Sequence, residues 1–338
     1  MQTAIRFQSI SKTYRDRRGW LDWLPGRGGA TGDKHALRNV SFLVRPGEIV
    51  SLLGPNGSGK TTAIKILASL VTATEGSAAI AGFDTSTQSL QSRAQIGYCM
   101  AEERSFYFRL TGRQNLRFFG RLRGLSHDAV DRDIERLEPI LRHGDLDGRF
   151  MTYSTGMKQK LSLFRALIGS ARVLLLDEPT RGLDPHSTKL FLDELRAYAR
   201  DRGTAILLSS HDLDAVDRVS DRLLFLHRGR LLADDAPDEV LRRFSIPQEV
   251  VIEVRDPDES FRAALRRTIG DGAREELDRG GGTVRFTCEA EGTETDWVRF
   301  LRDQAGSHGG VVRLSWKPGS LESLFARFSV EDDDGDER

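Results

Sequence analysis

Cysteine is scarce in this chain of 338 residues, since only Cys99 and Cys288 occur and they lie far apart in the sequence. A disulfide framework is therefore not expected, and a reducing cytoplasm is the default compartment for such a composition. The chain has no run of about 18 apolar residues, so we expect no segment that crosses a bilayer by itself. Residues 1–12 also lack the apolar centre of a signal peptide. A role at a membrane would have to come from a partner chain or from a surface contact.

The chain also lacks an excess of charge of either sign. It carries 50 basic and 50 acidic side chains, which gives no overall attraction for nucleic acid. No internal repeat is visible, and a hydrophobic fraction of 38% is ordinary for a globular protein with a sizeable core. The length predicts about two domains of typical size.

One glycine-rich stretch fits the P-loop pattern G-x-x-x-x-G-K-[ST], and it reads Gly54-Pro55-Asn56-Gly57-Ser58-Gly59-Lys60-Thr61. The apolar run before it predicts a buried parallel strand, and the apolar spacing after it predicts a helix. Glycines let the backbone approach a ligand closely, and the N–H groups of a helix start stabilise an anion. We therefore predict a triphosphate site, in which Lys60 contacts the β- and γ-phosphates and Thr61 ligates Mg²⁺.

Two acidic residues, Asp177 and Glu178, follow the apolar run 173–176. A strand that ends in acids places carboxylates at the carboxyl edge of a parallel sheet, where ligands bind in α/β proteins. Asp177 is the candidate partner of Mg²⁺, directly or through water, because this ion prefers oxygen ligands. Glu178 is the candidate base that orients an attacking water. Taken alone, the same pattern also fits a turn with solvated acids.

A second helix start follows Tyr153 and carries Ser154, Thr155 and Gly156. Ser154 can cap the helix, and Gly156 keeps its first turn open to a ligand. One triphosphate needs only one such cradle, so the second indicates a site for another subunit's nucleotide, with an ordinary capped helix as the alternative. His211 follows the apolar run 205–208 at the same sheet edge, a position that favours a γ-phosphate contact over the structural role more usual for a lone histidine.

Alternating apolar runs and helical periodicities predict an α/β fold with a doubly wound, mostly parallel sheet. The expected strands are residues 4–10, 40–44, 48–53, 76–80, 95–100, 173–176, 205–208, 223–226 and 230–233. The expected helices are the P-loop helix, residues 110–125 and 126–141, a helix that starts at Ser154, and residues 187–199. The strands at the two ends of this region look antiparallel.

A domain boundary is expected near residues 244–247. It separates a nucleotide-binding domain, residues 1–244, from a small α+β domain, residues 245–330, and an acidic tail, residues 331–338, that is expected to be disordered. In the small domain we expect strands at residues 249–254, 282–288 and 310–315 and helices at residues 261–268 and 295–305.

In this order and spacing, the motifs resemble those of the ATP-binding subunit of an ABC transporter, over about residues 1–240. Residues 54–61 are similar to its Walker A motif, residues 173–178 to Walker B, and residues 153–157 to a divergent signature motif. The resemblance implies a P-loop NTPase fold of the RecA-like kind, with an antiparallel β subdomain and a helical subdomain. It also implies a homodimer in which two ATP molecules lie between the Walker A motif of one subunit and the signature of the other.

The resemblance extends to single residues. It implies that Thr62 joins the P-loop in binding ATP, that Tyr14 stacks on adenine and that Asp184 belongs to the D-loop. His211 corresponds to the switch histidine, which acts beside Glu178 in catalysis. Ser154, Thr155 and Gly156 would contact the partner subunit's ATP.

Three departures from the family pattern stand out. Thr155 replaces the first glycine of the signature, and Met157 stands where glutamine is usual. The glutamine expected after the strand at residues 95–100 is missing, and Ala101-Glu102-Glu103 stands in its place. Glu102 or Glu103 could hold a Mg²⁺-bound water instead, and we name Glu102 as a metal-site candidate. The segment at residues 15–34 is long for the family and could contact lipid headgroups or the membrane subunit, or be a solvated loop.

The form Tyr-Ser-Thr-Gly-Met is similar to that of export-type members. We therefore expect a Mg²⁺-dependent ATPase that powers export through a separate multi-span membrane subunit. The ATPase chain itself would be peripheral on the cytoplasmic face of the cell membrane and would not bind nucleic acid. The alternatives are a soluble ABC-type ATPase that acts on DNA or ribosomes, and a regulator that binds the nucleotide without hydrolysing it.

Overall fold

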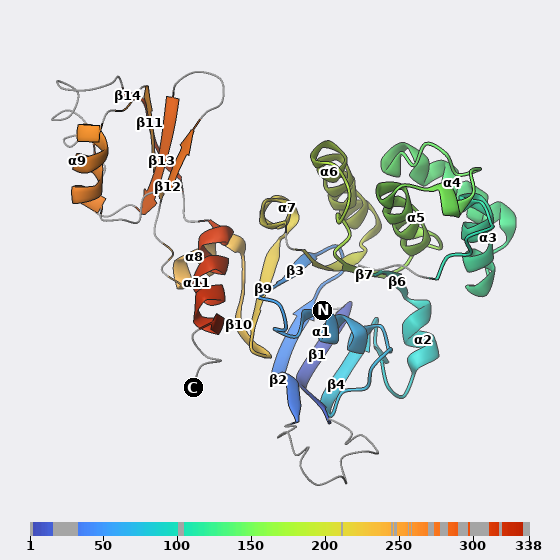
Figure 1. Ribbon diagram of the computed structural model, residues 1–338. Coiled ribbons are helices and arrows are strands. Elements are labelled where there is room, and N and C mark those ends of the chain that lie inside the picture. Colours follow the sequence, from blue (N-terminus) through green and yellow to red (C-terminus); the bar gives the residue numbers. More distant parts are fainter. Residues whose placement is uncertain are drawn as a thin grey trace, which may run out of the picture. The chain divides into compact units, whose positions relative to one another are not determined.

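The protein is described here by a computed structural model that covers residues 3–15, 33–100, 105–210, 212–244, 246, 249–255, 257, 259–269, 274–277, 283–289, 297, 311–317 and 320–333. The chain divides into two compact units, Met1–Val240 and Leu241–Arg338 (Figure 1). The division falls inside helix α8 (Pro237–Arg243), a few residues before the boundary expected near residues 244–247. Among the described residues, no helix has the length and apolarity needed to cross a membrane.

A six-stranded sheet forms the centre of the first unit. Its order is β10 (Arg230–Asp235), β9 (Arg222–His227), β3 (Ile49–Leu53), β8 (Ala205–Ser209), β7 (Val173–Asp177) and β6 (Ile96–Cys99). All neighbouring pairs are parallel except β10 with β9, which form a hairpin. Three of the four inner strands, β3, β7 and β8, are buried along their whole length, as their continuous apolar runs predict. The predicted α/β fold with a mostly parallel sheet is confirmed.

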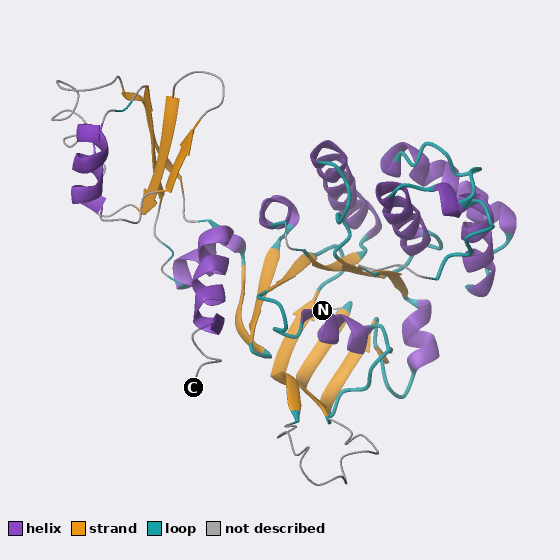
Figure 2. Ribbon diagram, in the orientation of Figure 1, coloured by secondary structure: helices purple, strands orange, loops and turns teal. Residues whose placement is uncertain are grey.

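A second, antiparallel sheet lies against this core. It has the order β2 (Lys34–Val44), β1 (Ile5–Tyr14), β4 (Glu75–Ile80) and β5 (Phe83–Asp84). Strands β1 and β2 are longer than predicted, because bulges interrupt their alternation of apolar and polar residues while the pairing continues as far as Tyr14 and Lys34. Helix α1 (Lys60–Leu67) shares one buried core with both sheets, and Figure 2 shows it between them.

The remaining helices of this unit surround the sheet. They are α2 (Ser89–Ala94), α3 (Gly112–Leu122), α4 (His127–Leu141), the short 3₁₀ helix η1 (Phe150–Thr152), α5 (Thr155–Leu167), α6 (Pro185–Arg202) and α7 (Leu213–Val219). Helices α3 and α4 form the predicted helical insertion, and each starts at a hydroxyl cap: Thr111 accepts from the N–H of Gln114, and Ser126 from that of Ala129. Arg117 of α3 forms a hydrogen-bonded ion pair with Asp131 of α4 and joins the two helices.

The second unit is a small sheet with helices. Its strands have the order β12 (Arg274–Leu277), β13 (Thr283–Glu289), β11 (Glu249–Arg255) and β14 (Val311–Lys317), all antiparallel. Helix α9 (Glu259–Ile269) connects β11 to β12 across β13, which makes a split β-α-β arrangement. Helix α11 (Leu321–Asp333) returns to the start of this unit, where Arg327 donates to the carbonyl of Phe244 (2.9 Å) and Phe328 packs on the Phe244 ring.

Several elements were not predicted. Helices α2, α7 and α8 have at most seven residues each, so their apolar spacing hardly repeats and carries little periodic signal. The two-residue strand β5 is too short to show alternation, and the charged strand β12 exists through its pairing with β13. Helix α11 runs to Asp333 and so includes the first three residues of the predicted acidic tail. Of the helix expected at residues 295–305, only Trp297 lies within the described residues, and it is buried.

Candidate functional site

The predicted P-loop joins β3 to α1 in a conformation that only glycine fits at two positions. At Gly54, with φ of 143°, an added Cβ would lie 1.8 Å from the carbonyl oxygen of Leu226. At Gly59, the N-cap residue of α1 with φ of 111°, an added Cβ would lie 2.5 Å from the carbonyl oxygen of Ala36. At neither position is there room for a side chain. With glycine there, the backbone turns tightly enough to point the first N–H groups of α1 at one place, where an anion can bind.

Lys60 is the first residue of α1, and its side chain is only 8% exposed. Its Nζ donates hydrogen bonds to the carbonyl oxygens of Gly54 (2.6 Å) and Pro55 (3.0 Å). Burial lowers the pKa of Lys60, and the nearby carboxylates of Glu178 and Asp177 partly oppose this shift. The ammonium is thus held inside the loop and close to two negative charges.

The two acids at the end of β7 have different surroundings. Asp177 is buried, and its Oδ1 accepts a hydrogen bond of 2.6 Å from the hydroxyl of Ser209 on the neighbouring strand β8. Glu178 has a left-handed backbone, with φ of 52°, which costs roughly 1–3 kcal/mol for a residue with a side chain. Its N–H donates to the carbonyl oxygen of Ser209 (3.1 Å). Such strained backbone is characteristic of functional sites and persists only where the surroundings hold it.

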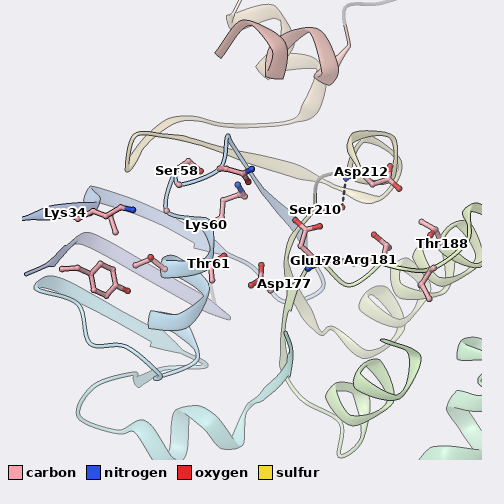
Figure 3. A pocket seen from close by; sticks show the side chains of 18 of the residues that line it. Lys34, Ser58, Lys60, Thr61, Asp177, Glu178, Arg181, Thr188, Ser210 and Asp212 are labelled. Carbon is pink, nitrogen blue, oxygen red and sulfur yellow. Dashed lines mark hydrogen bonds between the residues drawn. The ribbon is translucent and has the colours of Figure 1, made fainter. Parts of the chain in front are cut away.

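The P-loop and these acids line one cavity of about 860 Å³ (Figure 3). Lys60 and Thr61 approach it from α1, and Asp177 and Glu178 from the end of β7. The predicted residues that line it are Tyr14, Asn56, Gly57, Ser58, Gly59, Lys60, Thr61, Thr62, Asp177 and Glu178. Gly54 and Pro55 do not line it; their carbonyls hold Lys60 from behind.

Tyr14 is 39% exposed and ends strand β1, and the ammonium of Lys12 lies 4.9 Å from the centre of its ring. The ring lines the cavity together with Lys34, its pairing partner on β2. An aromatic ring at the rim of a triphosphate-sized cavity is suited to stack on a base.

Nine further residues line the cavity without having been predicted as site residues: Lys34, Ala36, Thr180, Arg181, Leu183, Pro185, Thr188, Ser210 and Asp212. Thr180 and Arg181 follow the acid pair after Pro179, and Ser210 and Asp212 flank His211, so proximity to the predicted motifs was an available signal for these four. Lys34 lies 20 residues beyond Tyr14 in sequence, and only the strand register places it there.

The predicted signature residues do not line this cavity. Ser154 caps α5 by accepting a hydrogen bond from the N–H of Met157 (3.2 Å), and both Ser154 and Thr155 are exposed. Gly156 lies beside the loop that follows the acids, since an added Cβ would lie 3.2 Å from the carbonyl oxygen of Gly182. The second helix start is therefore available on the surface of the chain.

Asp184 has a structural task of its own. Its side chain caps α6 by accepting from the N–H of Ser187 (2.9 Å), and hydrogen bonding by Ser187 lowers its pKa. Leu183 and Pro185, on either side of it, line the cavity. Glu102, His211 and most of the segment 15–34 lie outside the described residues, so their predicted roles stay predictions.

The donor set suits a nucleotide with a hard divalent ion. The hydroxyl of Ser58 is buried and has no hydrogen-bond partner among the residues that the structure describes. Thr61 and Asp177 supply the hydroxyl and carboxylate oxygens that Mg²⁺ prefers. Within the described part of the chain no three His, Cys, Asp or Glu side chains cluster as metal ligands. An ion here would therefore also need phosphate and water oxygens, as is usual for Mg²⁺.

Comparison with known proteins points in one direction. Residues 37–181 match the protein family described as ABC transporter. The chain is 37% identical over 198 residues to ABC transporter ATP-binding protein NatA of Bacillus subtilis, which covers 58% of this chain and 80% of that protein. It is 31% identical over 328 residues to Nod factor export ATP-binding protein I of Rhizobium etli, which covers 97% and 93%.

A solved structure agrees with these sequence relatives. It is described as the ATP binding subunit of an ABC transporter, and it matches with a TM-score of 0.61 and 29% identity. The match covers 72% of this chain and 94% of that one.

Proposed function

Because this chain belongs to the ABC transporter family, we propose that it is an ATP-hydrolysing subunit that powers export through a separate membrane-spanning subunit. The observation that carries the proposal is the single cavity that Lys60 shares with Asp177 and Glu178. The relative from Rhizobium etli, which matches over nearly the whole chain, is named as an export protein. No comparison supports the alternative of an ATPase that acts on DNA or ribosomes.

Each residue of the cavity has a distinct role in this proposal. The P-loop N–H groups and Lys60 bind the β- and γ-phosphates, and Tyr14 stacks on adenine. Thr61 and Asp177 hold Mg²⁺, which when bound neutralises charge on the transferred phosphoryl group. Glu178 orients the attacking water and accepts a proton from it. The hydroxyl of Ser209 holds Asp177 in place for its role at the metal site.

We further propose that two copies of the chain share each nucleotide. Ser154 and Thr155 are exposed at the start of α5 and do not line the cavity of their own chain. Such a start stabilises an anion, so it can complete the γ-phosphate face of the partner's site. The dimer would bind to the membrane subunit and thereby lie peripherally on the cytoplasmic face of the cell membrane, where ATP is available.

The surface that binds the membrane subunit is proposed to include an apolar patch made of Tyr107, Phe108 and Met151. These side chains are 50%, 59% and 57% exposed. The N–H of Met151 donates to the carbonyl of Phe108 (3.2 Å), so the patch is continuous across two segments far apart in sequence. Grouped exposed apolar residues of this kind mark protein interaction sites.

Replacing Phe108 and Met151 by serine is expected to weaken binding to the membrane subunit by at least about tenfold, which is the loss expected when a central apolar contact is removed. The first measurement is co-purification with the separate multi-span membrane subunit. The second is the stimulation of ATP hydrolysis by candidate cargos. Hydrolysis by the isolated chain should stay unchanged. Leu90→Ser is the control, since Leu90 is 73% exposed on α2. Equal losses in both variants would refute the patch.

The second unit is proposed to contact the same unit of a second copy of the chain and thereby to adjust the strength of dimerisation. One face of its sheet packs on α9 around Ile252 and Phe261, while the Glu253–Arg285 ion pair lies on the strands that form the other face. Truncation after Phe244 is expected to weaken ATP-dependent self-association by at least about fivefold, the lower end of typical coupling between sites. Analytical ultracentrifugation with ATP measures this. Unchanged self-association together with an unchanged ATPase rate would exclude the proposed role.

A further inference from the structure

Gln159 lies on α5, the helix that begins with the signature residues, and its side chain is only 6% exposed. Its Nε2 lies 3.0 Å from the carbonyl oxygen of Pro179 and 3.4 Å from that of Glu178. The same nitrogen lies 3.6 Å from Sγ of Cys99 at the end of β6. The two N–H bonds of this amide are thus shared among three acceptors, and two of these are the consecutive carbonyls of Glu178 and Pro179 in the loop that follows β7.

The backbone of Glu178 requires such support. Its left-handed conformation is held on the N-terminal side by the hydrogen bond of its N–H to Ser209 on β8. On the C-terminal side, the carbonyl of Glu178 accepts from the N–H of Arg181 (3.2 Å) and from Gln159. Gln159 also holds the next carbonyl, that of Pro179. Gln159 therefore contacts both peptide groups that follow the acid.

We propose that Gln159 is a positioning residue, which aims the carboxylate of Glu178 at the attacking water by holding the two carbonyls that follow it. This inference rests on the proposed function, in which Glu178 is the base. The inference also connects the two nucleotide sites of the proposed dimer. Helix α5 presents its first turn to the partner's nucleotide, and through Gln159 it holds Glu178, the base that acts on the chain's own nucleotide. A movement of α5 when the partner's nucleotide binds would reach Glu178 through this amide.

The first test replaces Gln159 by methionine, which keeps the length of the side chain and removes both donors. We expect kcat for ATP hydrolysis to fall by roughly 10- to 100-fold, since a misplacement of about 1 Å can reduce a rate by two orders of magnitude. KM for ATP and the dissociation constant for ADP should stay within about twofold, because Gln159 does not line the cavity. Gln159→Glu keeps the shape but places a carboxylate against both carbonyls, and it should lose at least as much.

A double-mutant cycle separates positioning from a general effect on folding. In the Glu178→Gln background there is no base to aim, so adding Gln159→Met should change the residual single-turnover rate by less than about twofold. Ser162→Ala is the matched control: Ser162 is a fully buried polar residue of the same helix that hydrogen-bonds Cys99 (3.3 Å). This control should hydrolyse ATP at the parental rate.

The inference is overturned by parental kcat in both Gln159 variants, by a loss confined to KM, or by the same loss in the Glu178→Gln background. If thermal melting shows that Gln159→Met does not fold, the cycle with Gln159→Glu decides. A failure of the proposed function looks different: the parental protein would not hydrolyse ATP, or Glu178→Gln alone would leave turnover intact.

Discussion

The Glu178→Gln variant is expected to bind ATP as the parental protein does and to hydrolyse it about 10²–10⁴-fold more slowly, the usual contribution of a general base. The amide has the same shape as the carboxylate and cannot accept the proton of the attacking water. Glu178 lines the cavity at the end of β7, with a backbone held in a strained conformation, so the substitution changes the chemistry at a site whose geometry is fixed by main-chain contacts.

The same variant should accumulate as a dimer when ATP is present, since we propose that ATP binding closes the dimer and hydrolysis opens it. Gel filtration with and without ATP measures the dimer, and phosphate release measures turnover. Glu194→Gln is the matched control, since Glu194 is an exposed glutamate of α6. Parental turnover in Glu178→Gln would show that the base is assigned wrongly.

Lys60→Ala is expected to abolish measurable ATP binding. Lys60 is buried at the start of α1, and its ammonium is the charged group that the P-loop carbonyls of Gly54 and Pro55 hold at the cavity. Removing one partner of a buried, hydrogen-bonded charge pair costs about 2–5 kcal/mol, which is a roughly 30- to 5,000-fold loss of affinity. Titration of a fluorescent ATP analogue measures the loss directly.

Lys65→Ala is the control for this substitution. Lys65 belongs to the same helix, but it is exposed in the last turn, away from the P-loop. It should bind ATP with parental affinity. A Lys60→Ala variant that binds ATP within about twofold of the parent would contradict the proposed role of the P-loop lysine, because so small a change lies far below the cost of losing a buried charge contact.

These predictions concern two separate groups of residues, those that line the cavity and those of the signature at the start of α5. Lys60 and Glu178 line the cavity of their own subunit and are proposed to act there, whereas Ser154 and Thr155 are exposed outside it and are proposed to reach a second subunit. The departures from the family pattern are at Thr155 and Met157 in the predicted signature and at Ala101-Glu102-Glu103, where a glutamine was expected. Coupling between subunits is therefore where this protein is expected to differ most from its relatives.

Local pattern was sufficient for the elements with a strong, repeated signal. The buried strands β3, β7 and β8 are short continuous apolar runs, and their edges follow from the residues that end those runs. The helices α3 and α4 repeat their apolar residues over three turns or more, and a hydroxyl cap starts each. Pattern was insufficient for α2, α7 and β12, which are held by neighbours rather than by periodicity of their own.

The sequence by itself determined the chemistry of the site: a phosphate-binding turn, a lysine, and two acids at a strand end are local features that short motifs specify completely. Only the tertiary structure decided which of these residues share a cavity, that Lys34 joins Tyr14 there through strand register, and that the signature residues lie outside it. It also decided that Gln159 holds the carbonyls of Glu178 and Pro179. The reason is physical: a hydrogen bond between residues about 20 positions apart depends on how a helix packs on a sheet, which no local spacing encodes.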